Sequence, residues 1–330
     1  MPKAKGAKLS SKLFDKDIPK EPNRVGFGEG LVLAGDANKN VVALCADLAE
    51  STKMSDFKAK YPDRFIEVGV AEQNLATVAA GLSLVGKVPY ITSYAGFSPG
   101  RNWEQIRTTI ALAETNVKIV GSHAGVSVGP DGATHQMLED LAIMRAMPKM
   151  IVIAPCDQIE ARKATFAVSQ MEGAVYMRFA REKTAIFTTD TTPFEIGKGQ
   201  LFWEGSDVSI IACGPLVYQA LLAAKELEKK KITADVINMP TIKPLDTEII
   251  RKSVAKTKAA VTVEEAQITG GLGGAVCEWL SENMPTPVVR VGMKDRFGES
   301  GDSDFLVRHF GMDSEGIIKA VETVLKKKGK

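Results

Sequence analysis

Two of the three histidines in this 330-residue chain lie in one glycine-rich segment, GSHAGVSVGPDGATHQ (121–136). The segment contains His123, Asp131 and His135 together with four glycines. Neutral imidazoles can donate or accept protons near physiological pH, and glycine lets a ligand approach the main chain. The segment could therefore contact the hydroxyl groups and the phosphate of a sugar phosphate. A hydrogen-bonded structural loop is the alternative, whereas a metal site is disfavoured because the sequence has no cysteine or third histidine close by.

These side chains must be positioned by the strands and helices around them. From residue 23 onward, short apolar strands alternate with amphipathic helices, which predicts a parallel sheet with helices on both faces. In such sheets ligands bind beyond the carboxyl ends of the strands, so the loops that follow strands are where a site is expected. The predicted strands are 41–46, 88–92, 117–121, 151–155 and 175–179, and the predicted helices are 25–34, 71–86, 103–114 and one after Asp157.

The segment TTDTTPFE interrupts this alternation and predicts a domain boundary near residue 190. A second α/β domain follows, with strands at 208–213, 233–238, 259–263 and 287–291, a helix with Pro215 in its first turn and a terminal helix at 314–327. The predicted fold class is α/β, with two successive domains that each have a largely parallel sheet flanked by helices. In the second domain GGLGG (270–274) cannot be aligned with G-x-G-x-x-G, so we expect a tight strand-to-helix turn there.

The first 22 residues alternate lysine with small residues, which predicts a flexible basic arm, either a solvated tail or a docking strap. Asp15 and Asp17 argue against a transit peptide.

Composition excludes several classes of protein. A net charge of +2 with both signs dispersed gives no support to a nucleic-acid partner. No apolar run is long enough to predict a membrane span, and the N-terminus lacks a secretory signal, so we expect a cytoplasmic protein. The four cysteines are far apart in sequence and lie in apolar stretches, which predicts buried thiols in a reducing compartment: Cys45, Cys156, Cys213 and Cys277.

Three motifs together resemble the pyrimidine-binding domain of transketolases: FIEVGVAEQN (65–74), SYAGF (93–97) and GPDGATHQ (129–136). Their order and spacing agree with that family, and residues 193–330 resemble its C-terminal domain. The resemblance implies a pyrimidine-binding domain over 23–190, a C-terminal domain over 191–330, and a thiamine diphosphate cofactor. It also implies transfer of a two-carbon ketol unit from a ketose phosphate to an aldose phosphate.

The resemblance assigns four residues to the cofactor. Glu72 corresponds to the catalytic glutamate that contacts the aminopyrimidine nitrogen and thereby activates the thiazolium carbon. Tyr94 and Phe97 correspond to aromatic residues that line the pyrimidine pocket, and Asp47 to an aspartate near the thiazolium ring. The structural alternatives are helix-dipole compensation for Glu72, core packing for the aromatic residues and a helix cap for Asp47.

The resemblance also assigns substrate-binding residues. His123, Asp131 and His135 correspond to residues that contact hydroxyl and carbonyl groups, and His135 is expected to be catalytic. The phosphate end corresponds to Arg24, Ser51, His123 and Arg181, since an arginine fork suits phosphate oxygens. Arg178 lies on the same strand end as Arg181, and a surface ion pair is the alternative for both.

Three positions depart from full-length transketolases and affect the expected donor range. Gln73 stands where a histidine is usual, Tyr94 replaces phenylalanine, and Ala124 follows His123 where an acid is common.

The sequence has no GDG motif of the kind that holds the diphosphate through Mg²⁺ in this family. The resemblance therefore implies a separate N-terminal subunit that shares the cofactor and holds Mg²⁺ or Ca²⁺, in an α₂β₂ assembly with self-association of this chain. The competing enzyme classes are a 2-oxoacid dehydrogenase first-component beta chain and a deoxyxylulose-phosphate synthase-like enzyme, and His123 argues against both. A non-catalytic regulatory homologue is the third alternative.

Overall fold

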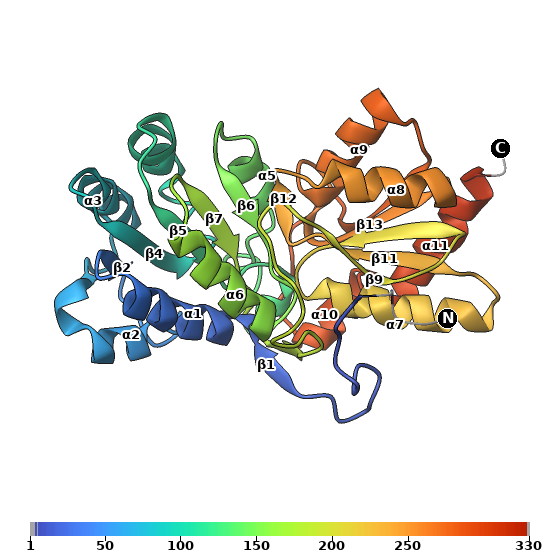
Figure 1. Cartoon of the computed structure of the whole chain (residues 1–330), viewed down its shortest axis with the longest axis horizontal. Coiled ribbons are helices and arrows are strands. Elements are labelled where there is room, and N and C mark those ends of the chain that lie inside the picture. The colour runs from blue at the N-terminus through green and yellow to red at the C-terminus, as the bar shows by residue number, and fades with distance from the viewer. Residues whose placement is uncertain (1–3, 5, 329–330) are drawn as a thin grey trace.

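The computed structural model describes residue 4 and residues 6–328 of the chain. Figure 1 shows two α/β domains side by side, the first formed mainly by the N-terminal half and the second by the C-terminal half. Each domain has a largely parallel sheet with helices on both faces, which confirms the predicted fold class.

The first domain is built on a seven-stranded sheet. All neighbouring strands are parallel except at one edge, where β12 runs antiparallel to β6. The spatial order is β12 (Thr241–Lys243), β6 (Ile151–Ile153), β7 (Val175–Arg178), β5 (Lys118–Ser122), β4 (Val88–Tyr94), β2 (Val41–Cys45) and β3 (Phe65–Glu67).

Helices cover both faces of this sheet because successive side chains of a strand point to opposite sides. In β2, Val41 and Ala43 pack into one apolar cluster, and Val42 and Leu44 pack into another. The first cluster lies under α1 (Asn23–Ala37), α2 (Ser55–Lys60) and α6 (Gln158–Ser169), and the second under α3 (Glu72–Leu84), η2 (Ile106–Leu112) and α5 (Asp140–Arg145).

One predicted helix differs from the structure. The segment 103–114 forms the short α4 (Trp103–Gln105) and then the π-helix η2. Two short 3-10 turns complete the domain, η1 (Pro62–Arg64) and η3 (Val126–Asp131).

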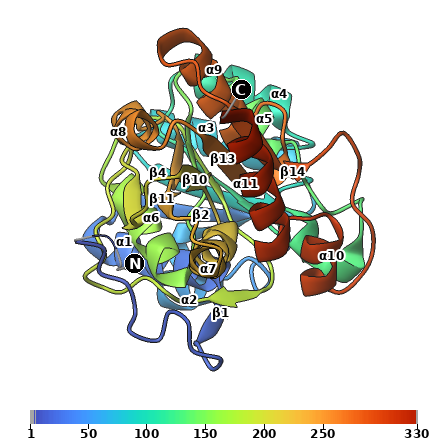
Figure 2. The ribbon, with the colours of Figure 1, turned by 90° about the vertical axis from the view of Figure 1, so that its right-hand side faces the viewer.

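The second domain has a five-stranded sheet with one antiparallel edge strand, β9. Its spatial order is β14 (Val288–Met293), β13 (Ala260–Gln267), β10 (Val208–Ala212), β11 (Ala234–Asn238) and β9 (Gln200–Trp203). Its helices are α7 (Leu216–Lys229), α8 (Thr247–Thr257), α9 (Leu272–Asn283), α10 (Ser303–His309) and α11 (Ser314–Lys328). Figure 2 shows this domain from its own side, with α7 and α11 nearest the viewer.

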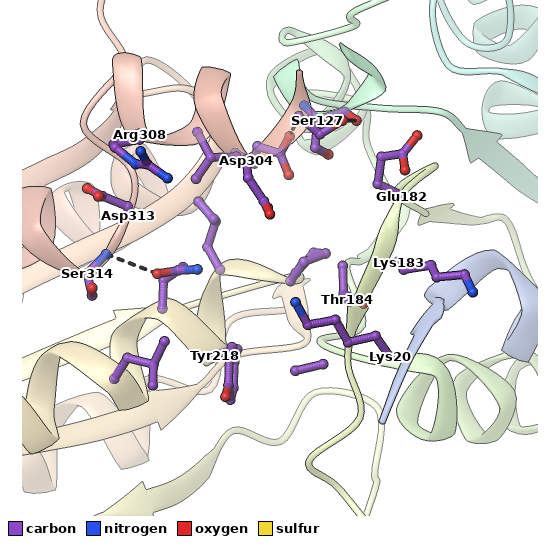
Figure 3. Close-up of a pocket in the computed structure, with 18 residues that line it drawn as sticks. Lys20, Ser127, Glu182, Lys183, Thr184, Tyr218, Asp304, Arg308, Asp313 and Ser314 are labelled. Carbon is purple, nitrogen blue, oxygen red and sulfur yellow. Dashed lines mark hydrogen bonds between the residues drawn. The ribbon is translucent and has the colours of Figure 1, made fainter. Parts of the chain in front are cut away.

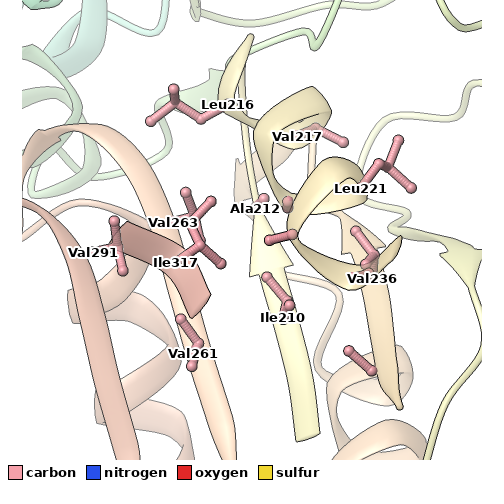
Figure 4. Packing of buried hydrophobic residues seen from close by; sticks show 14 of the residues in the cluster. Ile210, Ala212, Leu216, Val217, Leu221, Val236, Val261, Val263, Val291 and Ile317 are labelled. Carbon is pink, nitrogen blue, oxygen red and sulfur yellow. The ribbon is translucent and has the colours of Figure 1, made fainter. Parts of the chain in front are cut away.

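Figure 4 shows the part of the core under α7 and α11, in which the labelled side chains are all aliphatic. Val217 and Leu221 of α7 and Ile317 of α11 pack against β10, represented by Ile210 and Ala212. On the other side of the sheet, α8 and α9 contribute to the same apolar cluster as α3 and α5 of the first domain. The two domains therefore share a core, and β12 from the second half of the sequence completes the sheet of the first.

The N-terminal arm is docked in the structure. Leu9, Leu13 and Ile18 are buried in the core cluster of the second domain, and β1 (Lys20–Pro22) pairs with β8 (Lys183–Ala185). The structure thus differs from the predicted solvated tail over residues 6–22, because these apolar side chains lie between the lysines and are covered by the second domain. The rest of the predicted arm, residues 1–3 and 5, includes positions outside the described part of the chain.

The chain turns from β13 into α9 at residues 268–271, as predicted, and GGLGG (270–274) spans the end of this turn and the start of α9. The carboxylate of Glu264 accepts hydrogen bonds from the main-chain N–H groups of Leu272 and Gly273, at 2.7 and 2.8 Å. A Cβ on Gly271 would lie 2.0 Å from the Glu264 carboxylate, so this close approach requires glycine. A side chain of the protein itself therefore occupies the anion-binding end of α9.

Three of the four cysteines are buried, whereas Cys277 is half-buried, so the prediction of a buried thiol is wrong at that position.

Across residues 6–328, no helix has the length and apolar character needed to cross a membrane.

Candidate active site

The loops after neighbouring parallel strands of the first domain carry most of the predicted site residues. Tyr94 ends β4, His123 follows β5, Arg181 follows β7, and Glu72 begins α3 after β3. Because the carboxyl ends of these strands lie at one edge of the sheet, the fold brings together residues that are more than 100 positions apart.

Four rings form a continuous group at this edge. The rings of Tyr94 and His123 are stacked, with centroids 3.9 Å apart, and Phe97 lies 6.0 Å from Tyr94 and 5.4 Å from His135. All four rings were predicted site residues, and they present flat apolar faces beside two imidazoles. Such a surface suits a flat heteroaromatic ring.

Glu72 lies at the start of α3, with its side chain only 1% exposed. Its Oε2 accepts a hydrogen bond from Nη1 of Arg101 at 2.8 Å, and its Oε1 accepts one from the Ser93 hydroxyl at 3.3 Å. Dipole compensation alone does not require burial of the carboxylate. Its partners, Ser93 in β4 and Arg101 after it, come from the segment that also carries Tyr94 and Phe97.

His123 is held in an uncommon backbone conformation, with φ of +56°. Its Nδ1 lies 2.9 Å from the hydroxyl of Ser122, and burial lowers its pKa to about 3, with further lowering from Arg24, Arg181 and His135. The imidazole is therefore neutral at physiological pH. A left-handed backbone is uncommon at a non-glycine residue, although histidine adopts it more readily than most.

The two arginines predicted for the phosphate end are neighbours. Arg24 donates from Nε to the carbonyl of Arg181 at 3.2 Å and from Nη1 to the carbonyl of Ser51. Arg181 donates to the carbonyl of Val128 at 2.8 Å, and its Nη1 lies 3.7 Å from Asp131. Burial lowers the pKa of Arg24, and the positive charge of Arg181 lowers it further. A second carboxylate, Glu182, lies 3.6 Å from Nη1 of Arg181. Neither carboxylate forms a short ion pair with Arg181, so the two neighbouring arginines can still pair with an anionic group such as phosphate.

Arg178 has a different role from Arg181. It is buried and forms an ion pair with Asp140, with 2.8 Å between Nε and Oδ2, and it also donates to the carbonyl of Glu265 in the second domain at 2.7 Å. The surface ion pair considered for this residue is instead a buried link between the domains.

Asp47 forms its hydrogen bond with Glu67 and not with the residues around Tyr94 and His123. Its side chain is exposed, its φ is +57°, and its N–H donates to Glu67 at 2.7 Å. Glu67 also accepts from the N–H of Gly69 at 2.9 Å, so this carboxylate fixes both the turn at Asp47 and the turn that leads to Glu72.

The loop that carries Asp131 and His135 is supported by the second domain. Gln136 donates to the carbonyl of Glu299 at 2.8 Å, and the hydroxyl of Ser303 donates to the carbonyl of Ser127 at 2.8 Å. Beside Ser127 lies a cavity of about 380 Å³ between the two domains and the N-terminal strap, with Lys20, Arg308 and Tyr218 in its wall (Figure 3). This cavity is lined by none of the predicted site residues.

Ser93 and Arg101 contact the predicted site residue Glu72, and Glu67 contacts Asp47, but none of the three was predicted for the site. Ser93 lies in the recognised motif SYAGF and Glu67 in FIEVGVAEQN, so the motifs give their positions although not their contacts. Arg101 lies four residues after Phe97, a spacing that would have suggested proximity only if a helical turn had been predicted there.

Within the part of the chain that the structure describes, no three His, Cys, Asp or Glu side chains cluster as ligands of a metal ion would. The aromatic group and Glu72 fit a flat ring that bears a nitrogen. The described residues offer no cluster of ligands for the cation that binds the diphosphate.

Comparison with known proteins identifies both domains. The family model described as "Transketolase, pyrimidine binding domain" matches residues 22–185, and "Transketolase, C-terminal domain" matches residues 197–317. The chain is 44% identical over 307 residues to a "Putative transketolase C-terminal section" from Methanocaldococcus jannaschii, which covers 92% of this chain and 96% of that protein. It is 42% identical over 288 residues to "6-deoxy-6-sulfo-D-fructose transketolase subunit SqwH" from Clostridium sp. (strain MSTE9), covering 87% of this chain and 89% of that subunit.

A solved structure described as "Split gene transketolase, inactive beta4 tetramer" superimposes with a TM-score of 0.88 at 43% identity, covering 93% of this chain and 99% of that chain. The predicted resemblance is confirmed: this chain belongs to the transketolase family, of which it carries the pyrimidine-binding and C-terminal domains.

Proposed function

We propose that this chain is one subunit of a cytoplasmic, thiamine diphosphate-dependent transketolase that transfers a two-carbon ketol unit from a ketose phosphate to an aldose phosphate. Membership of the transketolase family implies dependence on thiamine diphosphate. The observation that carries the proposal is the buried carboxylate of Glu72, together with the stacked rings of Tyr94 and His123. Two arginines, Arg24 and Arg181, lie close enough to His123 to lower its pKa.

The aromatic group and Glu72 are the proposed contacts for the pyrimidine half of the cofactor. When bound, thiamine diphosphate supplies the carbon nucleophile and the electron sink that ketol transfer requires. Tyr94 and Phe97 would pack against the flat ring, and Glu72 would hydrogen-bond its ring nitrogen. Asp47, at the end of the neighbouring strand β2, is proposed to face the thiazolium side.

The remaining predicted residues form the proposed substrate side of the site. His123 and His135 would hydrogen-bond the hydroxyl and carbonyl oxygens of the sugar, and His135 would transfer protons there. Arg24 and Arg181 would pair with the phosphate, supported by Ser51 and by Asp131. Neutral His123 can act as a hydrogen-bond donor or acceptor to a sugar oxygen without a fixed charge.

A separate N-terminal subunit is proposed to complete the site and to hold the diphosphate through Mg²⁺ or Ca²⁺, in an α₂β₂ assembly. The match of this chain to relatives named as a C-terminal section and as a subunit supports a divided enzyme. The similar structure described as a β4 tetramer supports self-association of this chain.

Reconstitution tests the proposal. The purified chain should be inactive alone and should transfer the ketol unit of xylulose 5-phosphate once it is mixed with the N-terminal subunit and thiamine diphosphate. Robust transfer by the chain free of any partner would contradict the divided enzyme. Activity of the mixture only with pyruvate as donor would instead favour the synthase-like alternative.

The role of Glu72 is tested by Glu72→Gln, which is nearly isosteric. The variant should assemble with the partner but should slow hydrogen–deuterium exchange at the thiazolium carbon of the bound cofactor. An unchanged exchange rate in the assembled variant would refute the assignment.

A further inference from the structure

We propose that Arg101 is a positioning residue that orients the carboxylate of Glu72 toward the cofactor ring. This inference rests on the proposed function of Glu72, and it adds a residue outside the predicted site. The geometry that supports it is the 2.8 Å contact between Nη1 of Arg101 and Oε2 of Glu72.

The pair is asymmetric in exposure. The Arg101 side chain is 51% exposed, whereas Glu72 is 1% exposed. In an ordinary surface pair both partners are solvated and the contact contributes little. Here a guanidinium at the surface contacts a carboxylate that is shielded from water. Among the described residues, its removal leaves the buried Glu72 carboxylate with only the 3.3 Å contact from Ser93.

The main chain around Arg101 is fastened to Glu72 as well. The side-chain amide of Asn102 donates to the main-chain carbonyl of Glu72 at 2.8 Å and to the hydroxyl of Ser98 at 3.2 Å. The N–H of Arg101 donates to the carbonyl of Phe97 at 3.0 Å. The segment after β4 therefore holds both the backbone and the side chain at the start of α3.

Arg101 also touches the aromatic group. Its guanidinium carbon lies 4.9 Å from the ring centroid of Phe97, a cation–π distance. The guanidinium is thus restrained by a ring face and by Oε2 of Glu72. Each Glu72 oxygen accepts one hydrogen bond, Oε2 from Arg101 at 2.8 Å and Oε1 from Ser93 at 3.3 Å, so the carboxylate is held in one orientation and each oxygen keeps an acceptor site.

The position should require arginine chemistry. A planar guanidinium can lie over Phe97 and donate to Glu72 at once, whereas a lysine ammonium retains only the charge. Arg101→Met removes both, and Arg101→Lys keeps the charge. Arg107→Met is a matched control, because Arg107 is an exposed arginine in η2 that lines a hollow with Leu112 and Met147.

The experiment is a double-mutant cycle on cofactor binding in the reconstituted complex with the N-terminal subunit. Calorimetry measures the Kd of thiamine diphosphate for wild type, Arg101→Met, Glu72→Gln and the double variant. We expect Arg101→Met to raise the Kd roughly tenfold to hundredfold, in the range of a lost hydrogen bond to a charged group. In the Glu72→Gln background the same change should raise the Kd by less than about threefold, since Arg101 acts through Glu72.

Further measurements separate positioning from general damage. Arg101→Lys should recover part of the loss, and Arg107→Met should bind like wild type. With saturating cofactor, Arg101→Met should lower kcat while the KM for sugar phosphate stays within about twofold of wild type.

The outcomes distinguish this inference from the proposed function. If wild type binds the cofactor and Arg101→Met binds equally tightly, the inference on Arg101 is wrong and the function stands. Equal effects of Arg101→Met with and without Glu72→Gln would mean that Arg101 does not act through Glu72, which also overturns it. If the wild-type complex binds no thiamine diphosphate, both the function and the inference fail.

Discussion

Replacing Arg178 by methionine should destabilise the protein strongly although it changes no residue of the candidate site. Arg178 is 6% exposed and its partner Asp140 is fully buried, and Tyr176 donates to the same Asp140 oxygen at 2.8 Å. Arg178 also donates to the main-chain carbonyls of Met137 and Glu265, the latter in the second domain. The substitution leaves a buried carboxylate without its cation and removes a link between the domains.

The magnitude follows from that burial. Breaking a buried ion pair by removing one partner costs about 3–5 kcal/mol. An unfolding entropy of about 2.1 cal/mol/K per residue gives about 0.7 kcal/mol/K for a chain of 330 residues, so the melting temperature should fall by about 4–7 °C.

Differential scanning calorimetry of the isolated chain measures this shift. The control is Arg251→Met, which removes an exposed pair with Glu248 in which both side chains are about half exposed. The control should shift the melting temperature by less than about 2 °C. A second variant, Arg178→Met with Asp140→Leu, should be more stable than Arg178→Met alone because the buried Asp140 carboxylate that lost its cation is removed as well.

Two results would refute this reasoning. If Arg178→Met and Arg251→Met shift the melting temperature equally, burial does not decide the cost of losing the pair. If the double variant is less stable than Arg178→Met, the unpaired carboxylate is not the source of the loss.

Three further predictions concern the site and its surroundings. Arg181→Ala should lower kcat/KM roughly tenfold to hundredfold for xylulose 5-phosphate but little for unphosphorylated hydroxypyruvate, whereas His135→Ala should impair both donors; equal losses on both donors for Arg181→Ala would make it structural. The ring nitrogens of His123 should show no titration by ¹⁵N NMR between pH 5 and 8, because its pKa is lowered to about 3; a midpoint near 6.5 would contradict its burial. Burial raises the pKa of Glu160 to about 7, so its stabilising contribution is complete below about pH 4.5 and is lost as pH rises through 7. Urea midpoints of Glu160→Gln at pH 5 and 8 should therefore differ less than those of wild type, and an unchanged difference would exclude this residue as the cause.

Most strands of both sheets could be predicted because they form short apolar runs, such as VVALC of β2 and VSIIA of β10. The edge strands β3 and β9 were not among the predicted strands. β12 could not be predicted, because the three residues Thr241–Lys243 pair with a strand almost 90 positions earlier in the sequence. The docking of the N-terminal arm could not be predicted either, because it also depends on contacts with residues far away in the sequence. Leu9, Leu13 and Ile18 are separated by lysines and acids, and only the surface of the second domain shows that they are covered.

Most residues of the candidate site could be predicted, because three motifs contain them and the parallel sheet brings them to one edge. Its internal contacts were not predictable. The sequence places Glu72 before a helix, but the pairing with Arg101 depends on how the segment after β4 turns back toward α3. In the same way, the buried Arg178 and the half-exposed Arg181 differ by three positions at one strand end, and only the packing of the second domain separates them.

The antiparallel edge strand β12 determines how this protein can be divided in the laboratory. A fragment that ends near residue 190 would keep β6 but lose the strand that covers its open edge, and an uncovered edge is a template for aggregation. It would also expose apolar side chains of the core cluster that the two domains share. Chimeras with related enzymes should therefore exchange residues 23–190 together with 241–243, or exchange both domains as one block, if they are to remain in solution.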